Sequence, residues 1–200
     1  MDKHKAALRH LAKQDPVMAG LIKRLKLEPL ELRKNHFAAL VRSIIAQQLS
    51  TKVARTLNKR FLELYGGKFP PAETIIGTAE KKLRGIGLSF QKVSYIKNLA
   101  AAVANGQINF KKLVRQSDEE IIAQLTRIKG IGRWTAEMFL IFSLGHMDVY
   151  SHADLGLKNA VKKLYNIDPK FHTRKLKKLL DTWAPYKSHA SRLLWKSLDL

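Results

Sequence analysis

Apolar residues recur at spacings of three and four along almost the whole chain, which is the period of an amphipathic α-helix. Alternating patterns typical of β-strands are nearly absent. The clearest helical stripe runs through Phe37, Leu40, Val41, Ile44 and Ile45. The pattern therefore predicts an all-α fold of about ten or more helices and no sheet.

Helix starts are marked by short polar side chains that can accept a backbone hydrogen bond. Asp15 precedes a proline, and Ser117 stands three residues before Glu120, which is the spacing of a capping box. Asn35 and Ser50 have the same capping chemistry. We expect helices to begin after each of these capping residues.

The charge of the chain is strongly positive, with 37 Lys and Arg against 16 Asp and Glu, a net charge of +21. The excess is spread over both halves: residues 1–100 hold 20 basic and 7 acidic side chains, and residues 101–200 hold 17 and 9. A detachable basic tail would concentrate it in one run. The folded body itself is therefore expected to be basic, with nucleic acid as its partner.

Several classes of protein are excluded by what the sequence lacks. The 200 residues contain no cysteine, which rules out disulfides and thiolate-held metal clusters. The seven histidines show no H-x-x-x-H pair, so no catalytic metal is expected. No apolar run reaches the length of a membrane span, and the N-terminus has no signal-peptide core. We expect a soluble monomer without membrane contact, in the cytoplasm or, in a eukaryote, in the nucleus.

A glycine turn, Gly130-Ile131-Gly132, joins two predicted helices. Two glycines around one apolar residue allow a tight turn, after which the next helix presents unsatisfied N–H groups and a favourable dipole to an anion. Lys129 and Arg133 add positive charge, and Thr135 adds a hydroxyl. This combination predicts a phosphate cradle, although a G-x-G alone is more often a simple helix–helix turn.

Four segments together resemble the helix-hairpin-helix DNA glycosylases, within them the DNA-3-methyladenine glycosylase II group. They are residues 44–50 (IIAQQLS), 87–89 (GLS), 128–136 (IKGIGRWTA) and 148–150 (DVY) leading to Asp154. The resemblance covers most of residues 35–200, with the hairpin at about 118–145. It implies a two-lobed helical fold with an active-site cleft between the lobes, and residues 1–34 are expected to complete one lobe.

The resemblance places Asp154 at the catalytic aspartate of the family, although Asp is also a common helix N-cap. A carboxylate near the anomeric carbon stabilises the positive charge that develops on the sugar when an N-glycosidic bond breaks. The family often has a second acidic residue just before it, whereas this chain has Ala153. Trp134 stands where related strand-nicking enzymes carry a Schiff-base lysine, so the resemblance implies a glycosylase without lyase activity.

The implied reaction is the release of alkylated purines, 3-methyladenine and 7-methylguanine, from double-stranded DNA by base flipping, which leaves an abasic site for base excision repair. Trp134, Met138 and Trp195 match the base pocket of the family, where electron-rich rings would stack on a cationic base. Core packing is the plainer interpretation of a tryptophan in a helical protein.

The resemblance also implies the residues that contact DNA. One side chain of Gln47, Gln48, Leu49 and Ser50 would fill the gap left by the flipped base, with Gln48 or Leu49 as the candidates. The expected phosphate contacts are Ser89, Lys92, Lys129, Gly130, Gly132, Arg133 and Thr135. A structural monovalent cation would bind the backbone carbonyls of Thr126, Ile128 and Ile131, and no cofactor is expected to take part in catalysis.

Two other interpretations remain open. The chain could excise a different lesion, such as a deaminated or oxidised base. It could also be a noncatalytic helix-hairpin-helix module that only binds DNA, although Asp154, Trp134 and Trp195 together argue against this.

Overall fold

The computed structural model describes residues 2–32 and 34–200, and within these ranges every regular element is a helix. The all-α prediction is therefore confirmed. The chain divides into two compact units, one made from the residues up to Leu32 together with Leu140–Leu200, and the other from the residues between them. The expected segment 1–34 contributes its helices to the first unit, and its residues 1 and 33 lie outside the described residues.

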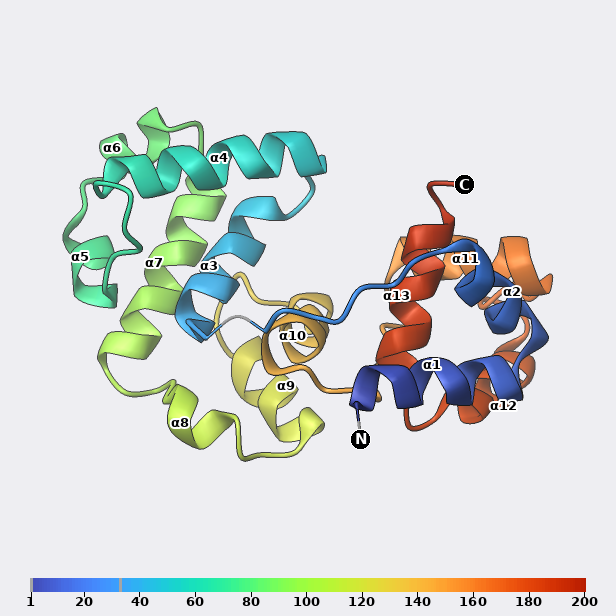
Figure 1. The fold of residues 1–200 in the computed structure, drawn as a ribbon. Helices are drawn as coiled ribbons and strands as arrows, with labels where there is room; N and C mark the ends of the chain where they lie inside the picture. The colour runs from blue at the N-terminus through green and yellow to red at the C-terminus, as the bar shows by residue number, and fades with distance from the viewer. Residues whose placement is uncertain (1, 33) are drawn as a thin grey trace. The chain divides into compact units, whose positions relative to one another are not determined.

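The unit formed by the middle of the chain is built around one buried helix. Its elements are α3 (His36–Ala46), α4 (Thr51–Leu64), α5 (Ala72–Gly77), α6 (Glu80–Gly85), α7 (Phe90–Ala104), α8 (Phe110–Leu113), α9 (Asp118–Thr126) and α10 (Arg133–Phe139). Helix α3 packs against α4, α7 and α10, as Figure 1 shows. Leu40, Val41, Ile44 and Ile45 on α3 are fully buried. The predicted apolar stripe therefore forms the core of this unit.

The other unit joins the two ends of the chain. Its elements are α1 (Lys3–Gln14), α2 (Pro16–Arg24), a π-helical turn (Leu140–Leu144), α11 (Leu155–Tyr165), α12 (Thr173–Trp183) and α13 (Lys187–Ser197). Helix α1 contacts α2, α12 and α13, and α13 also packs against α11 (Figure 1). The core residues include Leu11, Met18, Leu157, Trp183 and Leu193. Helices from both ends of the sequence thus share one core.

The predicted helix starts are confirmed. Asn35 Oδ1 accepts a hydrogen bond from Ala38 N at 2.9 Å, and Asp15 and Ser50 cap α2 and α4 in the same way. Ser117 forms the expected capping box with Glu120. Two features were not predicted: the single turn α8, and the π-helical turn that continues α10 up to Leu144.

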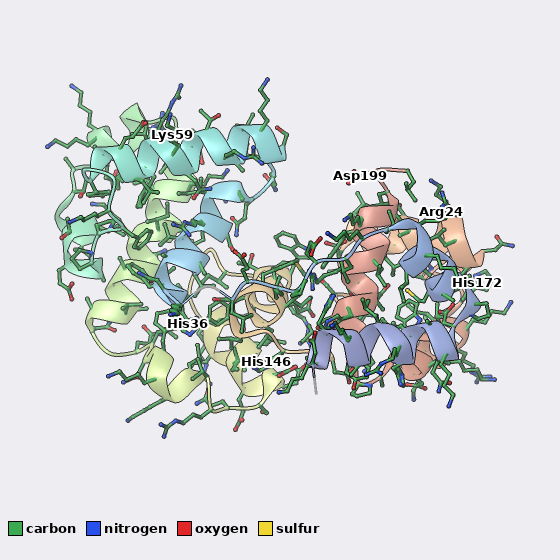
Figure 2. All side chains as sticks on the ribbon, viewed as in Figure 1. Arg24, His36, Lys59, His146, His172 and Asp199 are labelled. Carbon is green, nitrogen blue, oxygen red and sulfur yellow. The ribbon has the colours of Figure 1, made fainter. Side chains whose placement is uncertain are left out.

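Charged side chains cover both units, among them the exposed Lys59 on α4 and Arg24 at the end of α2 (Figure 2). In the described ranges, no helix combines the length and apolar character needed to cross a bilayer. The charge is therefore carried by the folded units, as expected from its spread along the sequence.

Candidate active site

Asp154 lies at the junction between a short loop and α11. Its Oδ1 accepts a hydrogen bond from Leu157 N at 2.8 Å, so it caps the helix, and its backbone N donates to Ser151 O at 3.2 Å. The residue is only 8% exposed. The helix-capping role considered from the sequence is thus confirmed, and it holds the carboxylate at the positive end of the α11 dipole.

A second donor reaches the same carboxylate oxygen from another helix. Trp195 Nε1, on α13, donates to Asp154 Oδ1 at 2.8 Å. A Cβ atom at Gly156 would lie 3.1 Å from both Trp195 Cδ1 and Asp154 Oδ1. A Cβ at position 156 would crowd both groups, so glycine gives the indole room to approach the first turn of α11. The carboxylate is therefore fixed by two N–H groups, one from the backbone and one from the indole.

Two further aromatic residues of the same unit lie near Trp195 or Asp154, namely Phe142 and Tyr150. The ring of Phe142 lies 5.7 Å from that of Trp195, centroid to centroid. Burial, together with the negative charge of Asp154, raises the pKa of Tyr150 to about 12. Tyr150 is therefore neutral at physiological pH.

The glycine turn lies in the other unit, between α9 and α10. Gly130 has φ +107°, and a Cβ there would lie 2.2 Å from Tyr95 Cγ on α7. Ile128 and Ile131 are buried, and Ile131 N donates to Ile128 O at 3.0 Å. The turn is therefore closed by its own backbone and anchored in the core, as its sequence suggests.

Arg133 is held by carboxylates of its own unit. Its two Nη atoms donate to the carboxylate oxygens of Glu119 on α9, and its Nε donates to Oε1 of the buried Glu137 at 3.0 Å. The hydrogen bond from Arg133 lowers the pKa of Glu119. The guanidinium therefore ties α9 to α10, although the Arg133 side chain is exposed, as that of Lys129 is.

The loop between α3 and α4 is tied to the glycine turn. Gln47 Nε2 donates to Gly130 O at 3.0 Å and to Thr135 Oγ1 at 3.3 Å. The next residue, Gln48, adopts a left-handed conformation with φ +57°, which is costly for a residue with a side chain. Gln48 and Leu49 are exposed, Leu49 to 37%. The contacts of Gln47 thus leave the following two side chains at the surface.

The other predicted residues differ in exposure. Trp134 is 39% exposed, whereas Met138 and Thr135 are buried. Ser89 caps α7 by accepting from Lys92 N at 3.2 Å, and Lys92 Nζ donates to Ile45 O at 2.7 Å. Partial burial lowers the pKa of Lys92. Ser89 and Lys92 therefore stabilise the ends of α7 and α3, in addition to any contact with DNA.

The three carbonyls predicted to hold a cation lie at the end of α9 and in the glycine turn. Thr126 is the last residue of α9, where helix carbonyls lack intrahelical partners, and the turn brings Ile128 and Ile131 close in sequence and space. Hard cations bind such carbonyl oxygens. Over the described ranges, no three His, Asp or Glu side chains gather as a metal site.

A hollow of about 610 Å³ lies at the opposite end of α3, beside α8. It is lined by Lys34, His36, Phe110 and Lys111, among others, and by none of the predicted site residues. The residues that sequence reasoning missed lie elsewhere: Gly156, Tyr95 and Glu119. Only Gly156 carries a signal in the sequence, because glycine is unusual inside a helix.

Comparison with known proteins identifies relatives of this chain. The chain is 37% identical over 171 residues to DNA-3-methyladenine glycosylase 1 of Schizosaccharomyces pombe, covering 84% of this chain and 75% of that protein. It is 30% identical over 172 residues to a DNA-3-methyladenine glycosylase of Bacillus subtilis, covering 81% of this chain and 57% of that protein. The chain spans 62% of the length of another B. subtilis relative, to which it is 33% identical.

The solved structures lead to the same family. The structure of a 3-methyladenine DNA glycosylase of S. pombe in complex with abasic DNA matches with a TM-score of 0.87 at 34% identity, covering 98% of this chain and 97% of that chain. Residues 41–185 match the family model of the HhH-GPD superfamily base excision DNA repair proteins. The chain therefore belongs to the HhH-GPD superfamily.

Proposed function

We propose that this protein is a DNA glycosylase that hydrolyses the N-glycosidic bond of alkylated purines, 3-methyladenine and 7-methylguanine, in double-stranded DNA. The observation that carries the proposal is the buried Asp154 carboxylate, held by Leu157 N and Trp195 Nε1 in a member of this family. The relatives named as 3-methyladenine glycosylases support 3-methyladenine as one of these bases.

Asp154 would act on the sugar. As the bond to the base lengthens, positive charge builds on the anomeric carbon and its ring oxygen, and a fixed carboxylate stabilises that charge. Asp154 would also orient the water that adds to the sugar, leaving an abasic site. Alkylation at N3 or N7 makes the base cationic, so it departs as a neutral molecule without protonation.

The base must leave the helix stack before it can react. We propose that Gln48 or Leu49 fills the gap in the duplex, because both side chains are exposed on a loop fixed by Gln47. The left-handed backbone at Gln48 supports this role, since strain of this kind is often retained at functional sites.

Trp134, which is 39% exposed, would stack its ring on the cationic base, because indole is the strongest side-chain partner for a cation. Met138 is largely buried and would form part of the floor of the base pocket. Trp134 has no amine with which to form a Schiff base, so the protein would release the base without nicking the strand. Trp195, whose indole N–H is bonded to Asp154, would form part of the base pocket next to the catalytic carboxylate.

Phosphates would bind at the glycine turn, where Lys129 supplies charge and the backbone around Gly130 and Gly132 supplies N–H donors. A monovalent cation on the carbonyls of Thr126, Ile128 and Ile131 would add positive charge there. It would take no part in bond cleavage, for which no cofactor is needed. The protein would work as a monomer where the DNA is, in a prokaryotic cytoplasm or a eukaryotic nucleus.

The test is to incubate methylated duplex DNA with the protein, identify any free base by mass spectrometry, and probe the DNA for alkali-labile sites. The proposal predicts free 3-methyladenine and 7-methylguanine, with strand breaks only after alkali. Release of a deaminated or oxidised base alone would show a different lesion specificity. Tight binding without any base release would show a noncatalytic module.

A further inference from the structure

We propose that Trp195 is a positioning residue for the glycosylase reaction, acting through the hydrogen bond of its indole N–H to Asp154 rather than only by stacking on the base. This inference rests on the proposed function, because it assigns to Trp195 the orientation of the carboxylate that would meet the sugar. The relevant contact is the 2.8 Å bond from Nε1 to Oδ1.

Two donors converge on one oxygen of Asp154. The first donor, Leu157 N, belongs to the backbone of α11, so a substitution of Trp195 leaves this donor in place. The second comes from α13, 41 residues further along the chain. The capping bond restrains Oδ1 from the α11 backbone, and the bond from Trp195 adds a second restraint on the same oxygen from α13, so the orientation of the carboxylate is better defined than by the cap alone.

The indole is itself held in place. It packs over Gly156, where a Cβ would come within 3.1 Å of Trp195 Cδ1 and 3.3 Å of Nε1. The Phe142 ring lies 5.7 Å away, and the preceding residue, Leu194, is fully buried and anchors this turn of α13. The donor is therefore in position before any substrate arrives, so the carboxylate needs no reorganisation during the reaction.

The hydrogen bond and the aromatic surface of Trp195 can be separated by chemistry. Trp195→3-benzothienylalanine replaces the indole N–H by sulfur and keeps the two fused rings, so stacking persists and the donor is lost. Trp195→Phe removes the donor and part of the ring.

Trp183→Phe is a matched control. In the wild-type protein, Trp183 Nε1 also donates to a buried carboxylate, that of Asp15, at 2.7 Å within the same unit. The variant therefore loses the same kind of bond at a position with no part in the proposed chemistry. We expect it to lower stability and to leave the excision rate of the folded protein unchanged.

The experiment measures single-turnover release of 7-methylguanine from a duplex at saturating protein, and separately the Kd for a duplex with a stable abasic-site analogue. Both Trp195 variants should excise roughly ten- to a hundredfold more slowly, the size expected from losing a hydrogen bond to a charged group. Their Kd should stay within about twofold of the unchanged protein, because the bond acts on Asp154 and not on DNA.

A wild-type rate for the benzothienyl variant overturns the inference and leaves the proposed function intact. An equal loss of rate in Trp183→Phe also overturns it, since the effect would then come from general loosening of the unit. If the unchanged protein releases no methylated base, the proposed function fails, and the inference with it.

Discussion

Trp183 donates its indole N–H to Oδ2 of Asp15 over 2.7 Å, and the hydroxyl of Tyr165 donates to the same oxygen over 2.7 Å. The other oxygen of Asp15 caps α2 through Val17 N and Met18 N. Burial and the contact with the Asp15 carboxylate raise the pKa of Tyr165. One buried carboxylate thus joins the N-terminal helices to α11 and α12, which is why residues near the start of the chain belong to the core of this unit.

Asp15→Ala should lower the free energy of unfolding by about 3 kcal/mol or more, because it removes a helix cap and leaves the buried Trp183 N–H and the partly buried Tyr165 hydroxyl without their acceptor. Asp2→Ala is the matched control: Asp2 caps α1 through His4 N at an exposed site, and its loss should cost about 1 kcal/mol or less. Urea unfolding followed by circular dichroism measures both. Equal effects of the two substitutions would contradict a joining role for Asp15.

Gly130→Ala should destabilise the protein by about 3 kcal/mol, since the new methyl group would meet the Tyr95 ring and the residue would keep a positive φ. Gly132→Ala is the comparison within the same turn, because nothing lies within 4 Å of a Cβ there. It should cost less than about 1 kcal/mol of stability. The account of the turn fails if thermal unfolding ranks the two substitutions the other way.

Lys129 and Arg133 should differ in their contribution to DNA affinity, although the sequence assigns both to phosphate binding. Both side chains are exposed, but Arg133 already pairs with Glu119 and Glu137, whereas no described carboxylate pairs with Lys129. Lys129→Ala should reduce the slope of log K against log salt by about 1, and Arg133→Ala by clearly less. Affinities for an undamaged duplex at several salt concentrations measure both slopes. Equal reductions would show that Arg133 leaves its carboxylates to bind phosphate.

His189 should make the protein sensitive to mild acid. Burial, with smaller effects from Arg192 and His4, lowers the pKa of His189 to about 4. The unfolded chain, with an ordinary histidine pKa near 6.5, takes up this proton first, so stability is full above about pH 6.5 and falls toward pH 4 by up to about 3 kcal/mol. His189→Gln should flatten this part of the stability curve. The exposed His172→Gln should keep the wild-type slope, and an unchanged slope in both would contradict the assignment.

The sequence predicts local structure well where one residue decides it. The caps at Asp15, Asn35, Ser50, Ser117 and Asp154 each follow from a side chain that bonds to the backbone a few residues away. The contacts that shape the candidate site join distant residues instead. The bonds from Trp195 to Asp154 and from Gln47 to Gly130 span 41 and 83 positions, and no local pattern encodes such a pairing.

In the folded chain, Arg133 and Lys92 each also have a partner that is distant in the sequence, and the sequence does not predict these contacts. Arg133 lies in a segment that resembles the family and Lys92 follows another one closely, so the sequence predicts phosphate binding by both basic residues. The folded chain gives Arg133 two carboxylates and gives Lys92 the carbonyl of Ile45. Only the three-dimensional arrangement distinguishes a basic group that already has a partner in the protein from one that is available to DNA.

The central claim is that Asp154 carries the chemistry, and the most direct measurement is single-turnover base release by Asp154→Asn from a 7-methylguanine duplex. Asparagine keeps an oxygen that can accept from Leu157 N and Trp195 Nε1, so the fold and the affinity for an abasic-site duplex should persist. The account predicts a loss of excision of at least about a thousandfold, because the negative charge is gone. Excision within tenfold of the unchanged protein would contradict it.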